Sequence, residues 1–160
     1  MYIVEYAYND TFDLDELYEA YTRAINDLAL YRDEPGTKED VMKSIQLFLP
    51  NTTLDDRCLF VAKDEDGYIV GLLVGLVSPN LLNPSRRIAN EMLLWVDKEH
   101  RKSSLARRLI KAYEDWARWA KCSDTTLSCY QDDDSIYLDR FYKVFGYNPV
   151  ETTYTKRIDK

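Results

Sequence analysis

Residues 90–121 read NEMLLWVDKEHRKSSLARRLIKAYEDWARWAK, and this stretch decides the fold. Its first part belongs to an apolar run over residues 88–97, which predicts a strand. Its last part predicts a helix over residues 104–121, because apolar side chains recur at helical spacing along one stripe: Leu105, Leu109, Ala112, Trp116 and Ala120. A strand, a short polar loop and a long helix therefore follow one another directly.

The loop between this strand and this helix is basic. The start of a helix presents free backbone N–H groups and the positive end of its dipole, which together favour an anion such as phosphate. Since the whole chain has a net charge of −7, a local excess of cations indicates a polyanionic ligand. The alternative is a solvated helix start with scattered cations. Within residues 101–111 there is no acid, and the cations are Arg101, Lys102, Arg107, Arg108 and Lys111.

The pattern on both sides of this stretch predicts an α/β fold, of the α+β type with a mixed sheet. The expected order is β, α, α, β, β, β, α, β, α, β, which favours one sheet of six to seven strands flanked by about four helices. We expect a single domain over residues 1–160. The predicted strands cover residues 2–7, 58–63, 68–77, 88–97, 125–130 and 150–158, and the predicted helices cover residues 13–28, 37–50, 104–121 and 134–145.

The composition disfavours several classes of function. An acidic chain does not suit nucleic acid or an anionic membrane as its main partner. The N-terminus is typical of a strand rather than a signal peptide, and no apolar run approaches membrane-spanning length. Cys58, Cys122 and Cys129 form no C-x-x-C motif and the chain has one His, so we expect neither a disulfide framework nor a metal site. These features favour the cytoplasm.

Several segments resemble the signature of the GNAT superfamily of acyl-CoA-dependent N-acetyltransferases. That signature is Arg/Gln-x-x-Gly-x-Gly/Ala, placed after a strand and at the opening of a helix. Residues 101–106, Arg-Lys-Ser-Ser-Leu-Ala, match its first and last positions, and Ser104 stands where the family usually has Gly. Downstream, residues 141–147 (FYKVFGY) resemble the family's Phe-Tyr-x-x-x-Gly-Phe helix end, and residues 150–154 resemble its last strand.

The resemblance implies acetyl-CoA as the co-substrate, with no metal. Backbone amides of residues 101–106 would hold the pyrophosphate, and the strand edge at residues 95–96 would pair with the pantetheine arm. Ser104 adds a Cβ where Gly lets the backbone approach phosphate, but Ser is also a favoured N-cap, so we expect weakened rather than abolished binding. The implied binding residues are Trp95, Val96, Arg101, Lys102, Ser103, Ser104, Leu105, Ala106 and Ser135, with Arg107 as a further candidate for the outer phosphate.

The resemblance also assigns two catalytic roles. Tyr142 stands at the position of the family's Tyr that protonates the leaving thiolate, and the alternative is that it only packs. Glu91, the only acid inside the strand before the loop, is the candidate general base. Strict alternation puts Glu91 on one face with Leu93 and Trp95, away from the usual position, unless the strand carries the bulge that the family commonly has. The alternative for Glu91 is a surface acid paired with Arg86 or Arg87.

Two functions follow as expectations. The first is an N-acetyltransferase that moves an acetyl group from acetyl-CoA to a primary amine, of a small molecule or a protein, by direct transfer. The second is a catalytically inactive protein of the same fold, with a binding or structural role. Residues 95–154 are also similar to small acetyltransferase-like proteins of tailed phages, which would place the protein in a host cytoplasm. Trp119 lies off the main helical stripe and is the candidate residue for a homodimer interface.

Overall fold

The computed structural model describes residues 1–8, 12–28, 36–51, 56–129, 135–156 and 158. The chain divides into two compact units, Met1–Thr126 and Leu127–Lys160. The expected single domain over residues 1–160 stays a prediction.

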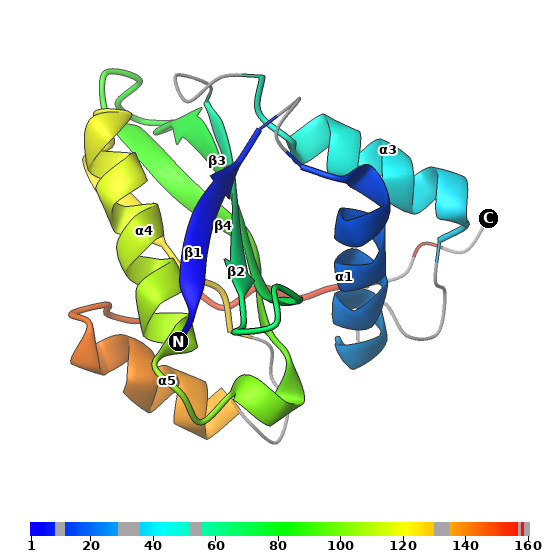
Figure 1. Ribbon diagram of the computed structural model, residues 1–160. Coiled ribbons are helices and arrows are strands. Elements are labelled where there is room, and N and C mark those ends of the chain that lie inside the picture. The colour runs from blue at the N-terminus through cyan, green and yellow to red at the C-terminus, as the bar shows by residue number, and fades with distance from the viewer. Residues whose placement is uncertain (9–11, 29–35, 52–55, 130–134, 157, 159–160) are drawn as a thin grey trace. The chain divides into compact units, whose positions relative to one another are not determined.

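The first unit is built on a five-stranded mixed sheet (Figure 1). Neighbouring strands are antiparallel except for the last pair, β4 and β5, which is parallel and is connected through helix α4. The two central strands read RCLFVAK and IVGLLVGLVSP, apolar runs that suit a sheet covered on both faces. In spatial order the strands are β1 (Ile3–Ala7), β2 (Arg57–Lys63), β3 (Ile69–Pro79), β4 (Arg87–Val96) and β5 (Asp124–Thr126).

Helices cover both faces of this sheet. Figure 1 shows α4 (Leu105–Trp119) on one face, with α1 (Leu14–Asp27) and α3 (Lys38–Phe48) on the other. The predicted helix starts are confirmed by their caps. Asp13 caps α1 by accepting a hydrogen bond from the backbone N–H of Asp15, and Thr37 with Asp40 forms a complete capping box on α3.

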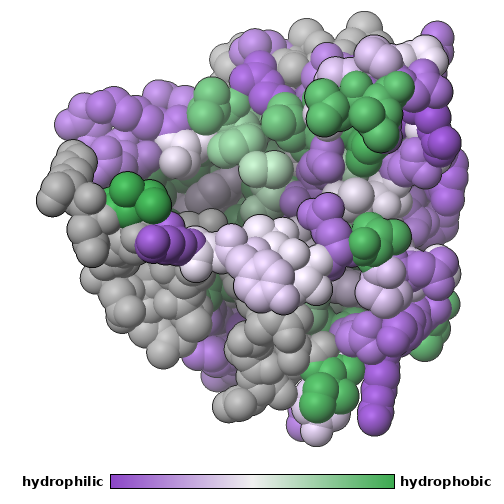
Figure 2. All heavy atoms as spheres, turned by 180° about the vertical axis from the view of Figure 1, so that it is seen from behind, coloured by the Kyte–Doolittle hydropathy of each residue, from purple (hydrophilic) through white to green (hydrophobic). Residues whose placement is uncertain are grey.

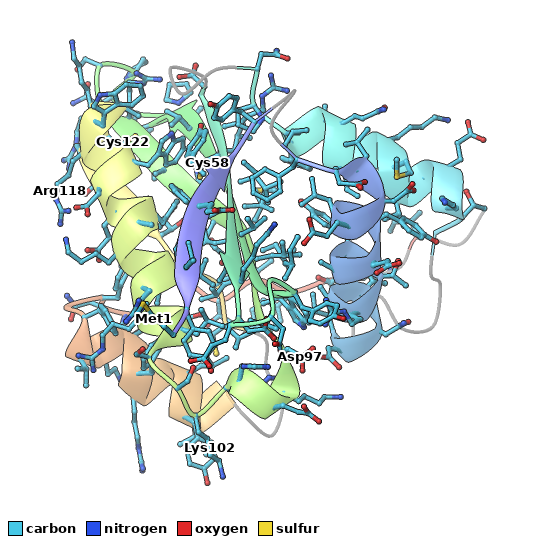
Figure 3. The ribbon with its side chains drawn as sticks, in the orientation of Figure 1. Met1, Cys58, Asp97, Lys102, Arg118 and Cys122 are labelled. Atoms are coloured by element: carbon cyan, nitrogen blue, oxygen red, sulfur yellow. The ribbon has the colours of Figure 1, made fainter. Side chains whose placement is uncertain are left out.

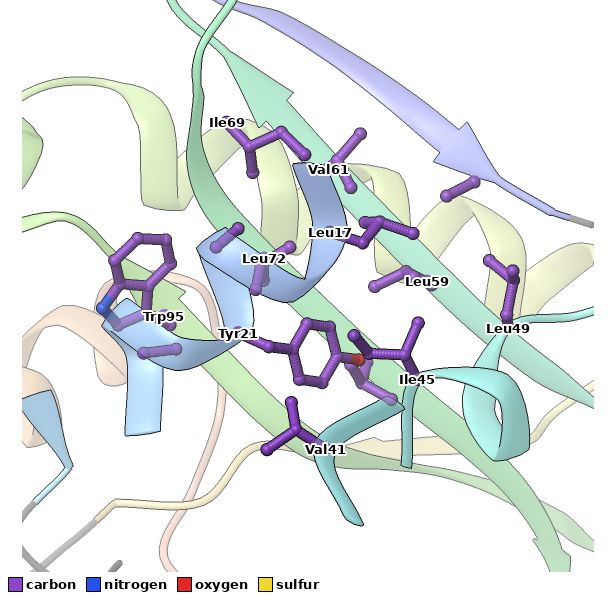
Figure 4. Close-up of a cluster of buried hydrophobic side chains, with 14 residues drawn as sticks. Leu17, Tyr21, Val41, Ile45, Leu49, Leu59, Val61, Ile69, Leu72 and Trp95 are labelled. Carbon is purple, nitrogen blue, oxygen red and sulfur yellow. The ribbon is translucent and has the colours of Figure 1, made fainter. Parts of the chain in front are cut away.

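The main core lies between the sheet and the pair α1 and α3. Figure 4 shows how side chains of the two helices meet those of the strands, and the cluster reaches the end of β4 at Trp95. The labelled members are all buried: Leu17, Tyr21, Val41, Ile45, Leu49, Leu59, Val61, Ile69, Leu72 and Trp95.

The other face of the sheet packs closely against α4. A Cβ on Gly75 of β3 would lie 2.8 Å from a ring carbon of Tyr113 and 2.8 Å from the sulfur of Cys58. A Cβ on Gly71 would lie 3.1 Å from a methyl carbon of Leu109. The absence of side chains at these two positions therefore lets α4 approach the sheet.

The second unit contains helix α5 (Ser135–Val144). The helix ends as predicted at Gly146, whose φ of 87° is in the left-handed region, and the Gly146 N–H donates to the carbonyl of Lys143 at 3.0 Å. Aromatic rings follow the helix, with Phe141 and Phe145 in an edge-to-face contact at 5.0 Å between ring centroids. The sequence FYKVFGY thus forms a helix end, as expected.

The strand count differs from the prediction. Among the described residues there are five strands rather than six to seven, and residues 150–156 and 158 belong to none. Val150 and Tyr154 are 84% and 90% exposed, so the alternating pattern there does not bury an apolar face, which a stable strand requires. The strand predicted over residues 125–130 is limited to β5; residues 127–129 are not in a strand, and Tyr130 lies outside the described residues.

Charged and polar side chains dominate the face drawn in Figure 2, where the apolar residues form separate groups. No described helix has the length and apolar character needed to cross a membrane.

Candidate functional site

Strand β4 carries one bulge, and it lies inside the predicted site. Val74 of β3 pairs with Leu93, but the next residue of β3, Gly75, pairs with Glu91. Strand β4 therefore has one extra residue, Met92, at this point. The bulge expected from the family resemblance is present.

The bulge turns Glu91 toward α4. Glu91 lies opposite Gly75, which faces Tyr113 of α4, and residues directly opposite each other project to the same face. Leu93 and Trp95 pack on the other face, against the core cluster of α1 and α3. Of the two arrangements considered for Glu91, strict alternation with Leu93 and Trp95 does not hold, because the extra residue interrupts the alternation, and the bulged strand is the one present. Glu91 is only 8% exposed.

The residue before Glu91 fixes the strand on both sides. The side-chain amide of Asn90 donates to Ser78 Oγ of β3 at 2.9 Å, and its Oδ1 accepts a hydrogen bond from Thr126 Oγ1 of β5 at 3.5 Å. Arg86 and Arg87, the alternative partners considered for Glu91, form ion pairs with Asp124 and Asp56.

Strand β5 pairs with only the first part of β4. Its three residues lie opposite Ile88, Ala89 and Asn90. Among the described residues of Met1–Thr126, the edge of β4 from Glu91 to Val96 therefore has no strand partner on the β5 side. We call this segment the open edge of β4. It contains the two residues that the resemblance assigns to the pantetheine arm.

The carbonyl of Val96 points out from the open edge. The N–H of Asp97 donates to the carbonyl of Val70 on β3 at 2.9 Å. Because the C=O and N–H of a trans peptide point in opposite directions, the Val96 carbonyl points away from β3. It accepts a hydrogen bond from Nε of Arg101 at 3.0 Å. The arginine of the loop motif thus contacts the open edge of β4.

The start of α4 is capped by the residue before the one expected. Ser104 is the N-cap residue, but its side chain makes no capping hydrogen bond. The Oγ of Ser103 accepts from the N–H of Leu105 at 3.1 Å and donates to the carbonyl of His100 at 2.6 Å. The φ of Ser104 is −77°, which any residue adopts. The backbone therefore needs no Gly here, and the steric difference from Gly is the hydroxymethyl side chain of Ser104.

The cations of the loop differ in their surroundings. Lys102 and Arg107 are exposed, and Lys102 lies where β4 leads into α4 (Figure 3). Arg108 donates to the carbonyl of Tyr2 at 2.9 Å, and Lys111 forms an i,i+4 ion pair along α4. Arg108 therefore connects α4 to the residues just before β1.

Sequence analysis missed one acidic residue of this region, Asp27, the last residue of α1. Its Oδ2 accepts hydrogen bonds from Nε1 of Trp95 at 3.0 Å and from Nη2 of Arg101 at 3.2 Å, and Nζ of Lys98 lies 2.7 Å from its Oδ1. Burial acts to raise the pKa of Asp27, but the hydrogen bonds from Lys98 and Trp95, with the charges of Lys98 and Arg101, outweigh it and hold this pKa below its ordinary value. The only local signal was a carboxylate at a helix C-terminus, where the dipole disfavours it.

A second side chain of α1 joins the same region. Arg23 lies 3.0 Å from the carboxylate of Asp97, donates to the carbonyl of Ile69 at 2.6 Å and stacks over the ring of Trp95 at 5.4 Å. Together with Asp27 it ties the C-terminal half of α1 to the end of β4.

The remaining predicted site residues lie in the second unit. Ser135 is the first residue of α5. Tyr142 lies in the same helix, is 7% exposed, and its hydroxyl donates to the carbonyl of Ser128 at 3.0 Å. The structure thus brings the predicted binding residues of the first unit onto one strand end and loop, and it describes Tyr142 and Ser135 in a separate unit.

The described residues contain no group of three or more His, Cys, Asp or Glu side chains that could hold a metal ion. His100 is engaged with Tyr2, whose hydroxyl lies 3.0 Å from Nδ1.

Comparisons with known proteins give one family and one fold. Residues 14–147 match the model of the family described as acetyltransferase (GNAT) family. No curated protein sequence matches the chain significantly.

Solved structures resemble the chain over nearly its full length. Glucosamine-6-phosphate N-acetyltransferase from Arabidopsis thaliana has a TM-score of 0.76 at 14% identity, covering 99% of both chains. A GNAT family acetyltransferase from Staphylococcus aureus has a TM-score of 0.69 at 19% identity, covering 98% of both chains. AAC(6')-Iy, in complex with the bisubstrate analogue CoA-S-monomethyl-acetylneamine, has a TM-score of 0.74 at 12% identity, covering 100% of this chain and 99% of the other. At these identities the likeness shows a shared fold.

Proposed function

Because the chain belongs to the GNAT family of acetyltransferases, we propose that it transfers an acetyl group from acetyl-CoA to a primary amine by direct transfer. The observation that carries this proposal is the bulged strand β4, whose open edge leads through a basic loop into the start of α4. A strand edge offers hydrogen bonds to the amide groups of a pantetheine arm, and a helix start offers N–H groups to a pyrophosphate.

The chain's own groups fit such a ligand. The open edge includes Trp95 and Val96, and the backbone of residues 101–106 forms the turn into α4. Lys102 and Arg107 are exposed cations beside that turn. Ser104 does not have the left-handed conformation that favours Gly, so the loop adopts its backbone conformation without strain although Ser stands in place of Gly. We propose residues 101–106 as the pyrophosphate site on this basis.

Amine acetylation requires two proton transfers. The amine nitrogen must lose a proton as it forms the bond to the thioester carbonyl carbon, and the sulfur must gain one as the C–S bond breaks. We assign the first transfer to Glu91 and the second to Tyr142. Glu91 is 8% exposed, projects toward α4 and is the only acid of β4, so its carboxylate is the group of this strand that can accept the amine proton. The Tyr142 O–H, which donates to the Ser128 carbonyl, must turn to the thiolate to serve as the acid.

Binding and turnover test this proposal in sequence. Acetyl-CoA should raise the melting temperature, because a ligand that binds only the native state stabilises it. A panel of small amines, peptide N-termini and lysine peptides, assayed for release of free CoA thiol, should then identify an acceptor. The absence of any melting shift at millimolar acetyl-CoA would overturn the proposal. A shift without turnover on any amine would support the alternative, a catalytically inactive CoA-binding protein.

A further inference from the structure

The carboxylate of Asp27 occupies a position where three donors converge. Trp95, Lys98 and Arg101 all contact it, at 3.0, 2.7 and 3.2 Å, and its side chain is 16% exposed. Two of the three donors are cations from the segment that connects β4 to α4. Asp27 itself comes from α1, 68 residues before Trp95 in the sequence.

This position is unfavourable for a carboxylate unless cations hold it. Asp27 is the last residue of α1, where the negative end of the helix dipole repels a carboxylate, and the last turn of the helix has no basic residue. The cations therefore come from outside the helix. Conversely, Lys98 and Arg101 find in Asp27 an anion supplied by the protein.

One of these two cations, Arg101, is also the first residue of the loop motif. Arg101 donates one hydrogen bond from Nε to the carbonyl of Val96 and another from Nη2 to Asp27. A guanidinium binds a carboxylate and a phosphate through the same planar set of donors. A phosphate that reaches Arg101 must therefore share this group with Asp27 or take it from Asp27.

We propose that Asp27 is a built-in counter-ion that competes with the phosphate groups of CoA for Arg101 and Lys98. In the free protein it holds the loop against α1, and during binding it gives up part of that contact. Asp27 thus stabilises the fold and lowers the affinity for CoA at the same time. This inference rests on the proposed function, because it takes CoA as the ligand of the loop.

The decisive experiment compares two variants that remove the same charge. Asp27→Asn keeps the size of the side chain and an acceptor for Trp95 but removes the negative charge. Asp97→Asn removes an equal charge nearby, but the cation partner of Asp97 is Arg23 of α1 rather than a residue of the loop. CoA affinity is measured for both variants and the wild type by calorimetry, and stability by thermal melting.

We expect Asp27→Asn to bind CoA about fivefold more tightly than the wild type, the effect of losing one partly exposed ion pair as a competitor, and to melt at a lower temperature. Asp97→Asn should melt lower without that gain in affinity. If Asp27→Asn binds CoA no more tightly than Asp97→Asn, the inference is wrong while the proposed function stands. A wild type that binds no CoA overturns both.

A second measurement is made on the wild-type protein, and a variant is used only to assign one resonance. The indole N–H resonance of Trp95, assigned with Trp95→Phe, reports the hydrogen bond to Asp27. CoA should shift it as Asp27 changes partners, and pantetheine, which carries no phosphate, should shift it much less. Equal shifts with both ligands would show that occupation of the strand edge, and not competition for the cations, moves the resonance, and would overturn the inference.

Discussion

The two halves of β4 belong to one strand but have different neighbours. Residues 88–90 are paired on both sides, with β3 and with β5, and Asn90 adds side-chain hydrogen bonds in both directions. Residues 91–96 are paired with β3 and form the open edge. The bulge at Met92 lies near the start of the second half. The first half is an interior part of the sheet. The second half has an edge whose backbone N–H and C=O groups can bind a ligand, and its Val96 carbonyl binds Arg101.

The largest effect is expected at the boundary between the halves. Glu91→Gln removes the proposed base while keeping the size of the side chain, so kcat on a true acceptor should fall about 100-fold, the usual contribution of general base catalysis. CoA affinity should change little. Steady-state kinetics measure the first quantity and calorimetry the second. Glu114→Gln, on α4 and paired with Arg118, is the matched control. An unchanged kcat for Glu91→Gln removes Glu91 from the mechanism.

Gly75, opposite Glu91 on β3, tests how tightly the boundary between the halves is packed against α4. Gly75→Ala places a Cβ 2.8 Å from the ring of Tyr113, and a rigid ring has little room to move, so the free energy of unfolding should fall by about 2 kcal/mol. Gly71→Ala meets the methyl end of Leu109 at 3.1 Å, which can rotate, and should cost less. Urea unfolding gives both values. Equal costs would contradict the difference in packing.

Changes in the basic loop that follows the second half of β4 should alter the affinity for CoA. Replacing Arg101 and Lys102 together by Ala should weaken CoA binding about tenfold, by the loss of charge-assisted hydrogen bonds to phosphate. The pair Lys43→Ala and Arg118→Ala removes the same charge from other helices and should leave CoA affinity close to the wild-type value. Calorimetry decides between them, and unchanged affinity in the first pair excludes the placement of the phosphates.

The smallest effect is a pH dependence of the melting temperature that comes from Asp27 of α1, which contacts Trp95 in the second half of β4. The pKa of Asp27 in the folded protein lies below its ordinary value, so its ionised form stabilises the fold above the ordinary pKa of Asp, and this stabilisation is lost as the pH falls through the folded pKa. The difference in melting temperature between the wild type and Asp27→Asn should therefore narrow from pH 7 to pH 3. The difference between the wild type and Asn90→Ala, which involves no carboxylate, should not show this narrowing.

Local patterns predicted much of this fold. The helix starts at Asp13 and Thr37, the stripe of α4 and the Gly146 helix end are set by residues a few positions apart, so a sequence pattern contains them. The loop motif is local in the same sense. From these local patterns the sequence predicted both the family resemblance and the order of helices and strands in the first unit.

Long-range features escaped prediction. The position of the bulge depends on the register between β3 and β4, so the sequence left the face of Glu91 open between strict alternation and a bulged strand. Asp27 meets the loop only after α1 packs on the sheet, so nothing near it in the sequence marks its role. The strand predicted over residues 150–158 failed because alternation describes a side-chain pattern and says nothing of a partner strand.

Arg101 contacts both the Val96 carbonyl and Asp27, and this gives the first residue of the motif a role in the fold as well. A lysine at this position keeps the charge but lacks the planar fork that reaches both the Val96 carbonyl and Asp27. The contacts of Arg101 with the Val96 carbonyl and Asp27 therefore stabilise the fold whether or not CoA is bound. An Arg at the first position of the signature is thus no evidence of activity by itself, and that evidence has to come from other positions.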